Sequence, residues 1–179
     1  MRKVILYIAM SLDGYIADEK GGVQWLTGEN TENEDMGSYP EFIKGIDTVI
    51  LGWNTYHQII TELSPDNWVY SGMKTYVITH NSFEATEEII CYKEPLEYLI
   101  NTLKAEEGKD IWICGGAAIV GQLIEKNLID RYHITVIPTL LGGGIELFNK
   151  NHEELKLKLI STETFNSMVD LVYERRSLM

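Results

Sequence analysis

The chain has 179 residues, which is enough for one domain with a substantial core. Its 15 lysines and arginines against 27 aspartates and glutamates give a formal net charge of −12, which disfavours nucleic acid and anionic membranes as partners. Such a surface also repels phosphorylated ligands, so any phosphate site has to be local and built from backbone dipoles or a few placed side chains.

The cysteines and the start of the chain indicate a reducing compartment. Cys91 and Cys114 each lie in an apolar run, which is typical of buried free thiols and not of a disulfide or a metal site. The opening M-R-K-V-I-L-Y-I-A-M-S is too short in its apolar part to span a membrane, and Asp13 follows it closely. We therefore expect a first strand, no signal peptide, no metal and a cytoplasmic protein.

The first half of the chain alternates predicted strands and helices. Residues 4–10 are mostly β-branched or large and apolar, as in a central strand, and end in the turn-like tetrad S-L-D-G. Gly45 is expected to end a helix as its C-cap. The further elements expected up to residue 92 are the end of a helix at 39–45, a strand at 47–51, a helix at 53–63, a loop at 64–72 and strands at 74–79 and 88–92.

The second half continues this alternation and closes with a hairpin. Pro95 is expected to open a helix that runs to about residue 107, followed by a strand at 110–114, a helix up to residue 126 and a strand at 130–137. After an apolar loop with three glycines, residues 154–165 and 168–176 alternate around a turn at Asn166-Ser167. The expected fold class is a three-layer α/β domain over residues 1–179, with a mostly parallel sheet, helices on both faces and a C-terminal antiparallel hairpin.

Two glycine turns follow predicted strands and precede predicted helices. Gly115 and Gly116 follow one strand, and Gly52 leads into Asn54 and Thr55 after another. Parallel strands place such turns along one edge of a sheet, where backbone N–H groups and helix dipoles can hold a pyrophosphate. Alternatively, the glycines allow a helix to pack closely on the sheet, and neither turn is a complete G-x-G-x-x-G motif. Together the two turns predict a dinucleotide site.

Asp13 and Trp25 are candidates for the substrate side. A carboxylate in the turn after the first strand can handle a proton or accept from a hydroxyl or amine, although it can equally bond its own backbone in an Asx turn. Trp25 either anchors a loop over a pocket or is a plain core residue. His80 is a possible partner for an anion. His57, His133 and His152 form no ligand pattern, and no nucleophile elbow or triad is evident.

Several short motifs, in order, resemble the dihydrofolate-reductase-like superfamily. The chain is most similar to the reductase domain of the bifunctional riboflavin-biosynthesis deaminase/reductase and to its stand-alone bacterial relatives. The resemblance covers almost the whole chain and rests on A-M-S-L-D-G-Y-I-A (9–17), G-G-V-Q-W-L (21–26), L-G-W-N-T-Y (51–56), V-I-T-H-N (77–81), I-C-G-G-A-A-I-V (113–120) and I-P-T-L-L-G-G-G-I-E-L-F (137–148). No P-C-x-x-C occurs, so an attached zinc deaminase is not expected.

The resemblance implies a dihydrofolate-reductase-like fold, a homodimer, and NADPH as hydride donor to a pyrimidine- or pteridine-like substrate. In the riboflavin branch the family reaction reduces the ribose of a phosphoribosylamino-pyrimidine. The implied cofactor residues are Gly115, Gly116, Ala117, Ala118 and Ile119 at the pyrophosphate, Gly52, Trp53, Asn54 and Thr55 opposite, Thr79 and His80 near the adenosine ribose, and Ala9, Ile16 and Trp25 around the nicotinamide. The implied substrate side comprises Asp13, Trp25, Leu140 and Gly142, with Asp13 as the catalytic candidate.

The chain departs from the family pattern at two positions. The first glycine turn usually reads G-R-x-T, but Trp53 replaces the arginine here, and His80 stands where an arginine often follows Ser or Thr. Such arginines bind phosphates, including the 2′-phosphate that distinguishes NADPH from NADH. NADH therefore stays an alternative cofactor, and Lys74 or another basic side chain is a candidate replacement.

Two functional hypotheses remain open at this point. The first is a soluble NADPH-dependent reductase. The second is a nucleotide- or pterin-binding module that kept the pocket and lost turnover, which Trp53 and His80 favour slightly. A structural subunit, with the C-terminal hairpin as a dimer edge, is a weaker third interpretation.

Overall fold

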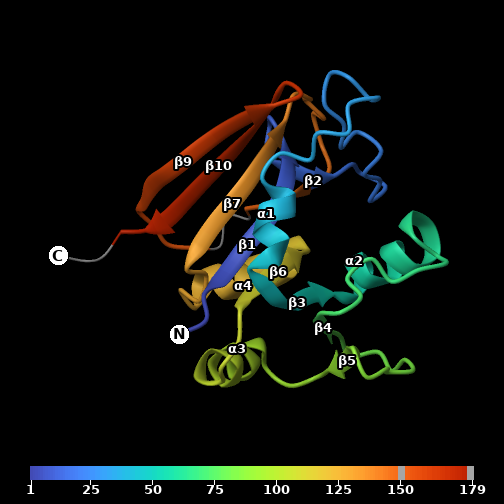
Figure 1. Cartoon of the computed structure of the whole chain (residues 1–179), viewed down its shortest axis with the longest axis vertical. Coiled ribbons are helices and arrows are strands. Elements are labelled where there is room, and N and C mark those ends of the chain that lie inside the picture. The colour runs from blue at the N-terminus through green and yellow to red at the C-terminus, as the bar shows by residue number, and fades with distance from the viewer. Residues whose placement is uncertain (149–151, 177–179) are drawn as a thin grey trace.

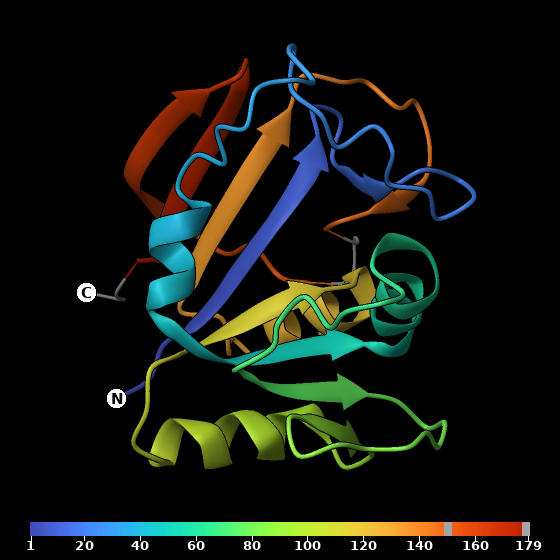
Figure 2. The ribbon, with the colours of Figure 1, turned by 45° about the vertical axis from the view of Figure 1, so that its right-hand side comes forward.

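An eight-stranded sheet runs through the centre of the protein in this computed structural model, which describes residues 1–148 and 152–176 (Figures 1 and 2). The six strands β5, β4, β3, β6, β1 and β7 are parallel, β10 is antiparallel to β7, and β9 is antiparallel to β10. The predicted mostly parallel sheet with a C-terminal antiparallel hairpin is thus confirmed. The order is β5 (Ile89–Tyr92), β4 (Lys74–Ile78), β3 (Ile46–Gly52), β6 (Asp110–Gly115), β1 (Val4–Ser11), β7 (Arg131–Ile137), β10 (Met168–Arg175) and β9 (Leu157–Phe165).

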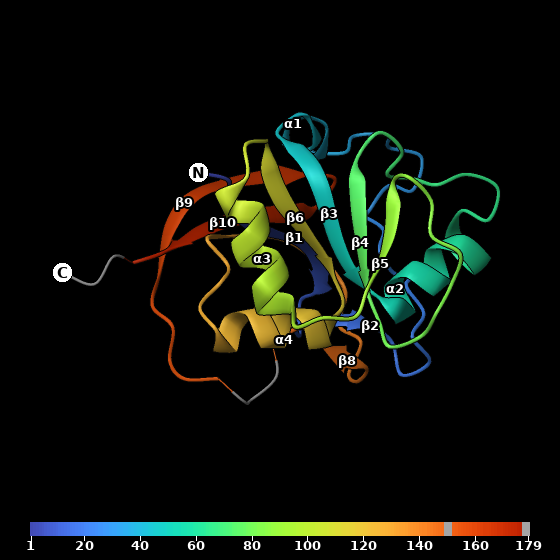
Figure 3. The same ribbon diagram turned by 90° about the horizontal axis from the view of Figure 1, so that it is seen from below.

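Helices cover both faces of this sheet (Figure 3). On one face, α3 (Leu96–Ala105) and α4 (Ala117–Glu125) pack on side chains such as Leu6, Ile50 and Ile113. On the other face, α1 (Tyr39–Lys44) lies over a second buried cluster that includes Val49 and Trp112. Because both faces are covered, β3 contains a continuous buried apolar run from Val49 to Leu51 and shows little alternation there, as parallel strands usually do.

The helix expected over residues 53–63 is divided in two. It consists of α2 (Trp53–Gln58) and the π-helical turn η1 (Ile59–Leu63). The helix expected to open at Pro95 begins one residue later, because Pro95 itself is the N-cap. The expected C-cap of α1 is confirmed, since Gly45 caps that helix. Gly45 has φ −86°, so it ends α1 without the left-handed conformation common at such positions.

Two short strands lie in segments for which the sequence predicted no strand, and the second of them lies in the expected apolar loop. They are β2 (Tyr15–Ala17) and β8 (Ile145–Glu146), which pair antiparallel beside the main sheet. The pairing needs a very close approach of the backbones, since a Cβ on Gly144 would lie 2.1 Å from the Ala17 carbonyl oxygen. The glycine run therefore serves to lay this loop along β2 (Figure 1).

The C-terminal hairpin turns where the sequence predicted, at Asn166 and Ser167. Both residues have positive φ, 45° and 61°, as in a two-residue hairpin turn. The loop that enters α1 docks on this turn, because Glu29 N–H donates to the Asn166 carbonyl and Ser167 donates to Glu29. The hairpin thereby holds the long segment between β2 and α1 at one end of the sheet.

Candidate functional site

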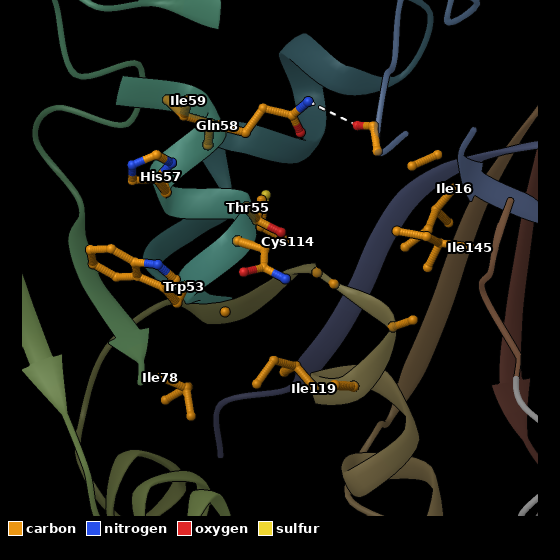
Figure 4. A pocket seen from close by; sticks show the side chains of 18 of the residues that line it. Ile16, Trp53, Thr55, His57, Gln58, Ile59, Ile78, Cys114, Ile119 and Ile145 are labelled. Carbon is orange, nitrogen blue, oxygen red and sulfur yellow. Dashed lines mark hydrogen bonds between the residues drawn. The ribbon is translucent and has the colours of Figure 1, made fainter. Parts of the chain in front are cut away.

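A cavity of about 1290 Å³ opens at the carboxyl ends of the parallel strands, where ligands bind in open α/β sheets (Figure 4). Every residue of the implied cofactor set other than Trp25 lines it. These residues are Ala9, Ile16, Gly52, Trp53, Asn54, Thr55, Thr79, His80, Gly115, Gly116, Ala117, Ala118 and Ile119.

The two glycine turns lie side by side at the floor of this cavity. Strands β3 and β6 are neighbours, and Leu51 pairs with Gly115 in their register. A Cβ on Gly52 would lie 3.8 Å from the Gly116 nitrogen, and one on Gly116 would lie 3.5 Å from Thr55 Oγ1. Gly115 has φ +129°, a conformation that side chains rarely tolerate. The expectation that both turns share one edge of the sheet is therefore confirmed.

The N-terminus of α4 faces the cavity with unused donors. In the first turn of this helix, the N–H groups of Ile119 and Val120 bond to the Gly116 carbonyl. Ala117 and Ala118 precede them, and helix geometry gives their N–H groups no intrahelical partner. Across the described part of the chain, no side chain caps this end. Two backbone donors and the positive end of the dipole are thus available to an anion, with no side-chain charge required.

One end of the cavity carries an apolar patch, with Glu19 and Lys20 on the turn beside it, and the other end, called the charged end below, carries titratable side chains. Ile16 and Ile145 lie on one side of Cys114 and Ile119, while Trp53 and Ile78 lie on the opposite side (Figure 4). Beyond this second side, the segments that follow β4 and β5 add His80, Lys93 and Glu94 to the lining. A ligand that spans the cavity therefore meets an apolar wall at one end and titratable groups at the other.

Trp53 forms a supported aromatic wall of the cavity. Its ring centroid lies 5.5 Å from that of His57, 5.8 Å from that of Tyr56 and 5.8 Å from that of Phe83. These neighbours restrict the indole, so the residue that replaces the usual arginine offers a fixed planar surface in place of a charge.

Asp13 does not line the cavity. Its carboxylate instead reaches the loop after β7 and accepts from the N–H groups of Leu141, at 3.1 Å, and Gly142, at 2.7 Å. The Ser11 hydroxyl donates to it at 2.6 Å. These hydrogen bonds, first that from Ser11, hold the pKa of the Asp13 carboxyl below its usual value. The carboxylate therefore stays ionised at neutral pH and pins the loop that carries β8.

The other residues implied for the substrate side also lie outside the cavity lining. Trp25 donates its indole N–H to the Gly22 carbonyl at 3.1 Å, which braces the turn between β2 and the long loop. Its neighbours Val23 and Leu26 line the cavity in its place. Leu140 is largely exposed, and Gly142 belongs to the loop segment that Asp13 holds. The structure thus groups Asp13, Leu140 and Gly142 with one another, while Trp25 stands apart from them.

Cys114 and Tyr70 form a polar contact in the cavity wall. The Tyr70 hydroxyl lies 3.2 Å from Cys114 Sγ, and both residues line the cavity. Burial raises the pKa of the Cys114 thiol to about 11 and also raises the pKa of Tyr70. Both groups are therefore neutral at physiological pH. Cys91 and Cys114 are free thiols as expected, but each residue is only partly buried, where the sequence predicted full burial.

A buried polar cluster joins the start of α1 to the sheet, and no sequence pattern predicted it. Asp170, only 1% exposed, accepts hydrogen bonds from Thr135, at 2.5 Å, and from Ser38. His133 Nε2 lies 3.4 Å from the same carboxylate and 3.0 Å from Ser38 Oγ. Tyr7 adds a contact to Ser38 at 3.3 Å. Asp170 pairs with Thr135 across β10 and β7, so strand register brings these residues together, which no local spacing could reveal.

The described part of the chain contains neither a candidate metal site nor a candidate membrane-spanning helix. Within residues 1–148 and 152–176, no group of three or more His, Cys, Asp or Glu side chains is arranged to hold a metal ion. In the same ranges, no helix has the length and apolar character needed to cross a bilayer.

Comparison with known sequences decides the family. Residues 2–171 match the model of the RibD C-terminal domain. The chain belongs to the RibD C-terminal domain family. It is 40% identical to the uncharacterized protein YwjB of Bacillus subtilis, over 97% of this chain and 98% of YwjB. The riboflavin biosynthesis protein RibD of Haemophilus influenzae is 22% identical, and the match covers 79% of this chain and 48% of RibD.

Solved structures agree with this membership in the RibD C-terminal domain family. A protein of Shewanella sp. PV-4, provisionally assigned to riboflavin biosynthesis, superposes with a TM-score of 0.83 at 30% identity, covering 98% of this chain and 99% of that one. RibD of Acinetobacter baumannii superposes with a TM-score of 0.71 at 20% identity, covering 98% of this chain and 58% of that one. Dihydrofolate reductase of Enterococcus faecalis, in complex with NADP(H), superposes with a TM-score of 0.70 at 18% identity, covering 98% of this chain and 97% of that one. The last two likenesses show a shared dihydrofolate-reductase-like fold, as the motifs implied.

Proposed function

We propose that this protein is a reductase that binds NADPH in the cavity at the strand ends and transfers a hydride to a pyrimidine- or pteridine-like substrate. The observation that carries the proposal is the meeting of two glycine turns beside the uncapped N-terminus of α4. Membership in the RibD C-terminal domain family supports it, as do neighbours whose names include a uracil reductase and a dihydrofolate reductase.

The residues present fit a dinucleotide. The volume of about 1290 Å³ exceeds that of a typical small-ligand pocket, as a long cofactor and a substrate together require. The glycines leave the backbone of the two turns open to close approach, and the free N–H groups of Ala117 and Ala118 suit a pyrophosphate. The apolar end at Ala9, Ile16 and Ile145 suits a nicotinamide ring.

In this proposal, the bound nicotinamide supplies the hydride. The chain contributes orientation and shelter from water. The first turn of α4 holds the phosphates, and the apolar side chains of Ile16 and Ile145 exclude water beside the ring. Asp13 acts indirectly, since its carboxylate fixes the loop that leads into β8 and so places Ile145 against the cavity.

The alternative is a binding module on the same fold that performs no turnover. Two observations favour it. Trp53 and His80 replace arginines in the cavity wall, and the carboxylate proposed for proton handling is engaged with a loop. This alternative shares the cofactor site with the reductase and differs only in chemistry.

A titration followed by an activity screen tests both hypotheses. NADPH and NADH are titrated while tryptophan fluorescence is recorded, and we expect quenching because Trp53 lines the cavity. Trp53→Phe should lose most of the quenching, whereas Trp25→Phe, outside the lining, should keep it. Failure of both cofactors to bind would refute the proposal. Binding without oxidation of the cofactor, over a panel of dihydropteridines and aminopyrimidines, would favour the module.

The family resemblance also leads us to propose a homodimer. The edge strand β9 is exposed over most of its length, with Leu159 49% and Ile160 44% exposed, and offers unpaired backbone groups for an interface. Size-exclusion chromatography with light scattering should give twice the 20.4 kDa mass of one chain. A monomer at micromolar concentration would contradict this expectation.

A further inference from the structure

The charged end of the cavity lies where the segments after β4 and β5 meet. The N–H of Thr79 donates to the Tyr92 carbonyl at 3.1 Å, which aligns the two strand ends. The Thr79 hydroxyl then accepts from the Asn81 N–H at 2.9 Å and turns the following loop. This arrangement brings Ser82 next to Lys93, the residue immediately after β5.

Lys93 is held in place at this rim. Its Nζ donates to Ser82 Oγ at 2.7 Å, and the residue lines the cavity. An ammonium group has three donors, so one contact with Ser82 leaves two for a ligand. In a chain of net charge −12, with Glu94 adjacent, a tethered cation at this place raises the local affinity for an anion.

The layout of the cavity determines which part of a dinucleotide would meet Lys93. If the pyrophosphate lies on α4, one arm extends towards Ile16 and Ile145 and the other towards Trp53 and Ile78 (Figure 4). Ile78 ends β4, and the segments that follow β4 and β5 bring His80 and Lys93 into the lining on this second side. The apolar end suits the nicotinamide, so the adenosine arm runs along Trp53 to the charged end. NADPH and NADH differ only by a phosphate on the ribose of that arm.

We propose that Lys93, positioned by Ser82, binds the 2′-phosphate of the cofactor and replaces the arginines that Trp53 and His80 displace. This inference rests on the proposed cofactor site and adds to it the residue that selects NADPH over NADH. A lysine ammonium is a point charge without the bidentate fork of arginine, and this one is exposed to solvent. The preference it confers is therefore modest, roughly tenfold in affinity.

Other lysines are less suitable for this role. Lys74 was a candidate from the sequence, but it begins β4, at the opposite end of that strand from Thr79, and does not line the cavity. Lys20 does line the cavity but comes from the turn after β2. The neighbouring carbonyl of Gly21 accepts from Gln58, so this turn is attached to the end of α2 and is not part of the β4–β5 segment that holds Lys93.

The experiment measures binding of the full chain by calorimetry, without turnover. The probes are NADPH, NADH, 2′,5′-ADP and 5′-AMP, and the variants are Lys93→Gln and Lys74→Gln, which remove the same charge at the two ends of the β4–β5 region. We expect Lys93→Gln to weaken NADPH and 2′,5′-ADP roughly tenfold and to leave NADH and 5′-AMP within twofold. Lys74→Gln should bind all four probes as the wild type does.

Salt dependence gives a second readout of the charge. Raising the salt concentration should weaken binding of 2′,5′-ADP to the wild type, and the slope should be shallower for Lys93→Gln. Equal affinity of the wild type for NADPH and NADH, or an equal effect of Lys93→Gln on both, would overturn the inference and leave the cofactor site intact. Binding of neither dinucleotide would overturn the proposed function and this inference with it.

Discussion

Removing the carboxylate of Asp170 should destabilise the protein more than a typical substitution. The side chain is 1% exposed and is the acceptor for Thr135 and Ser38, with His133 beside it. In Asp170→Ala, the buried Thr135 and His133 lose their partner, and an unsatisfied buried group costs about 1–3 kcal/mol. Because the packing of Ser38 and α1 is lost as well, we expect Asp170→Ala to lower the free energy of unfolding by roughly 3–5 kcal/mol in total. Asp170→Asn keeps one acceptor for Thr135 and should cost about 1–2 kcal/mol.

The assay is urea unfolding at pH 7, followed by tryptophan fluorescence and far-ultraviolet circular dichroism. Glu163→Gln is the matched control, because Glu163 pairs with Asp170 across the hairpin but is exposed. Its free energy of unfolding should change by less than about 0.5 kcal/mol. An Asp170→Ala variant as stable as this control would refute the reasoning and leave the cluster without a structural role.

The pH dependence of the free energy of unfolding, compared between the wild type and Asp170→Asn, provides an independent test. Burial alone would raise the pKa of the Asp170 carboxyl, but hydrogen bonds from His133, Ser38 and Thr135 hold it below its usual value. A carboxyl whose pKa is lowered by folding stabilises the protein fully above its unfolded pKa, near 4, and loses that contribution as the pH falls through the folded value. The difference in stability between wild type and Asp170→Asn should therefore shrink below about pH 4.

Three further predictions concern the loop after β7 and the cavity wall. Asp13→Asn should speed amide hydrogen exchange at Leu141 and Gly142, because their charged acceptor is lost. The control Asp66→Asn should leave these exchange rates unchanged. Equal exchange rates in both variants would contradict the role of Asp13 in holding the loop. Gly144→Ala places a Cβ 2.1 Å from a backbone oxygen at φ +136° and should cost roughly 3 kcal/mol or more in thermal unfolding, whereas Gly142→Ala has open space and should cost about 1–2 kcal/mol. Cys114, with its thiol pKa raised from 9.0 to about 11, should react with iodoacetamide at pH 8 about a hundredfold more slowly than an ordinary thiol; a rate like that of a free thiol would show that the raised pKa is wrong.

The sequence predicted those parts of the fold that depend on local pattern. Apolar runs ended by glycine identified β3 and β6, and period-two alternation around Asn166 identified the hairpin. The glycine turns at 52 and 115–116 could be paired in advance, because parallel strands share their carboxyl edge. The cofactor residues followed from the resemblance, and all of them except Trp25 line one cavity.

The features that the sequence did not predict depend on long-range pairing. β2 and β8 have three and two residues, and they pair only because Asp13 and the glycine run bring a distant loop alongside. Asp170 meets Ser38 across 132 positions of the chain, and Lys93 reaches the cavity because β5 ends beside β4. Hydrophobic periodicity does not encode such contacts, since it specifies which face a residue lies on and not which neighbour it meets.

The place of β1 in the sheet has a consequence for how the chain can fold during synthesis. This strand lies between β6 and β7, and its partners Ile111 and Arg131 are synthesised more than a hundred residues after it. Closing such long loops before any pairing is slow, and an apolar strand without partners is prone to aggregate meanwhile. Nascent chains stalled before β6 emerges should therefore be protease-sensitive. The proposed phosphate site, which lies at the end of β6, can therefore be completed only long after β1 has been synthesised.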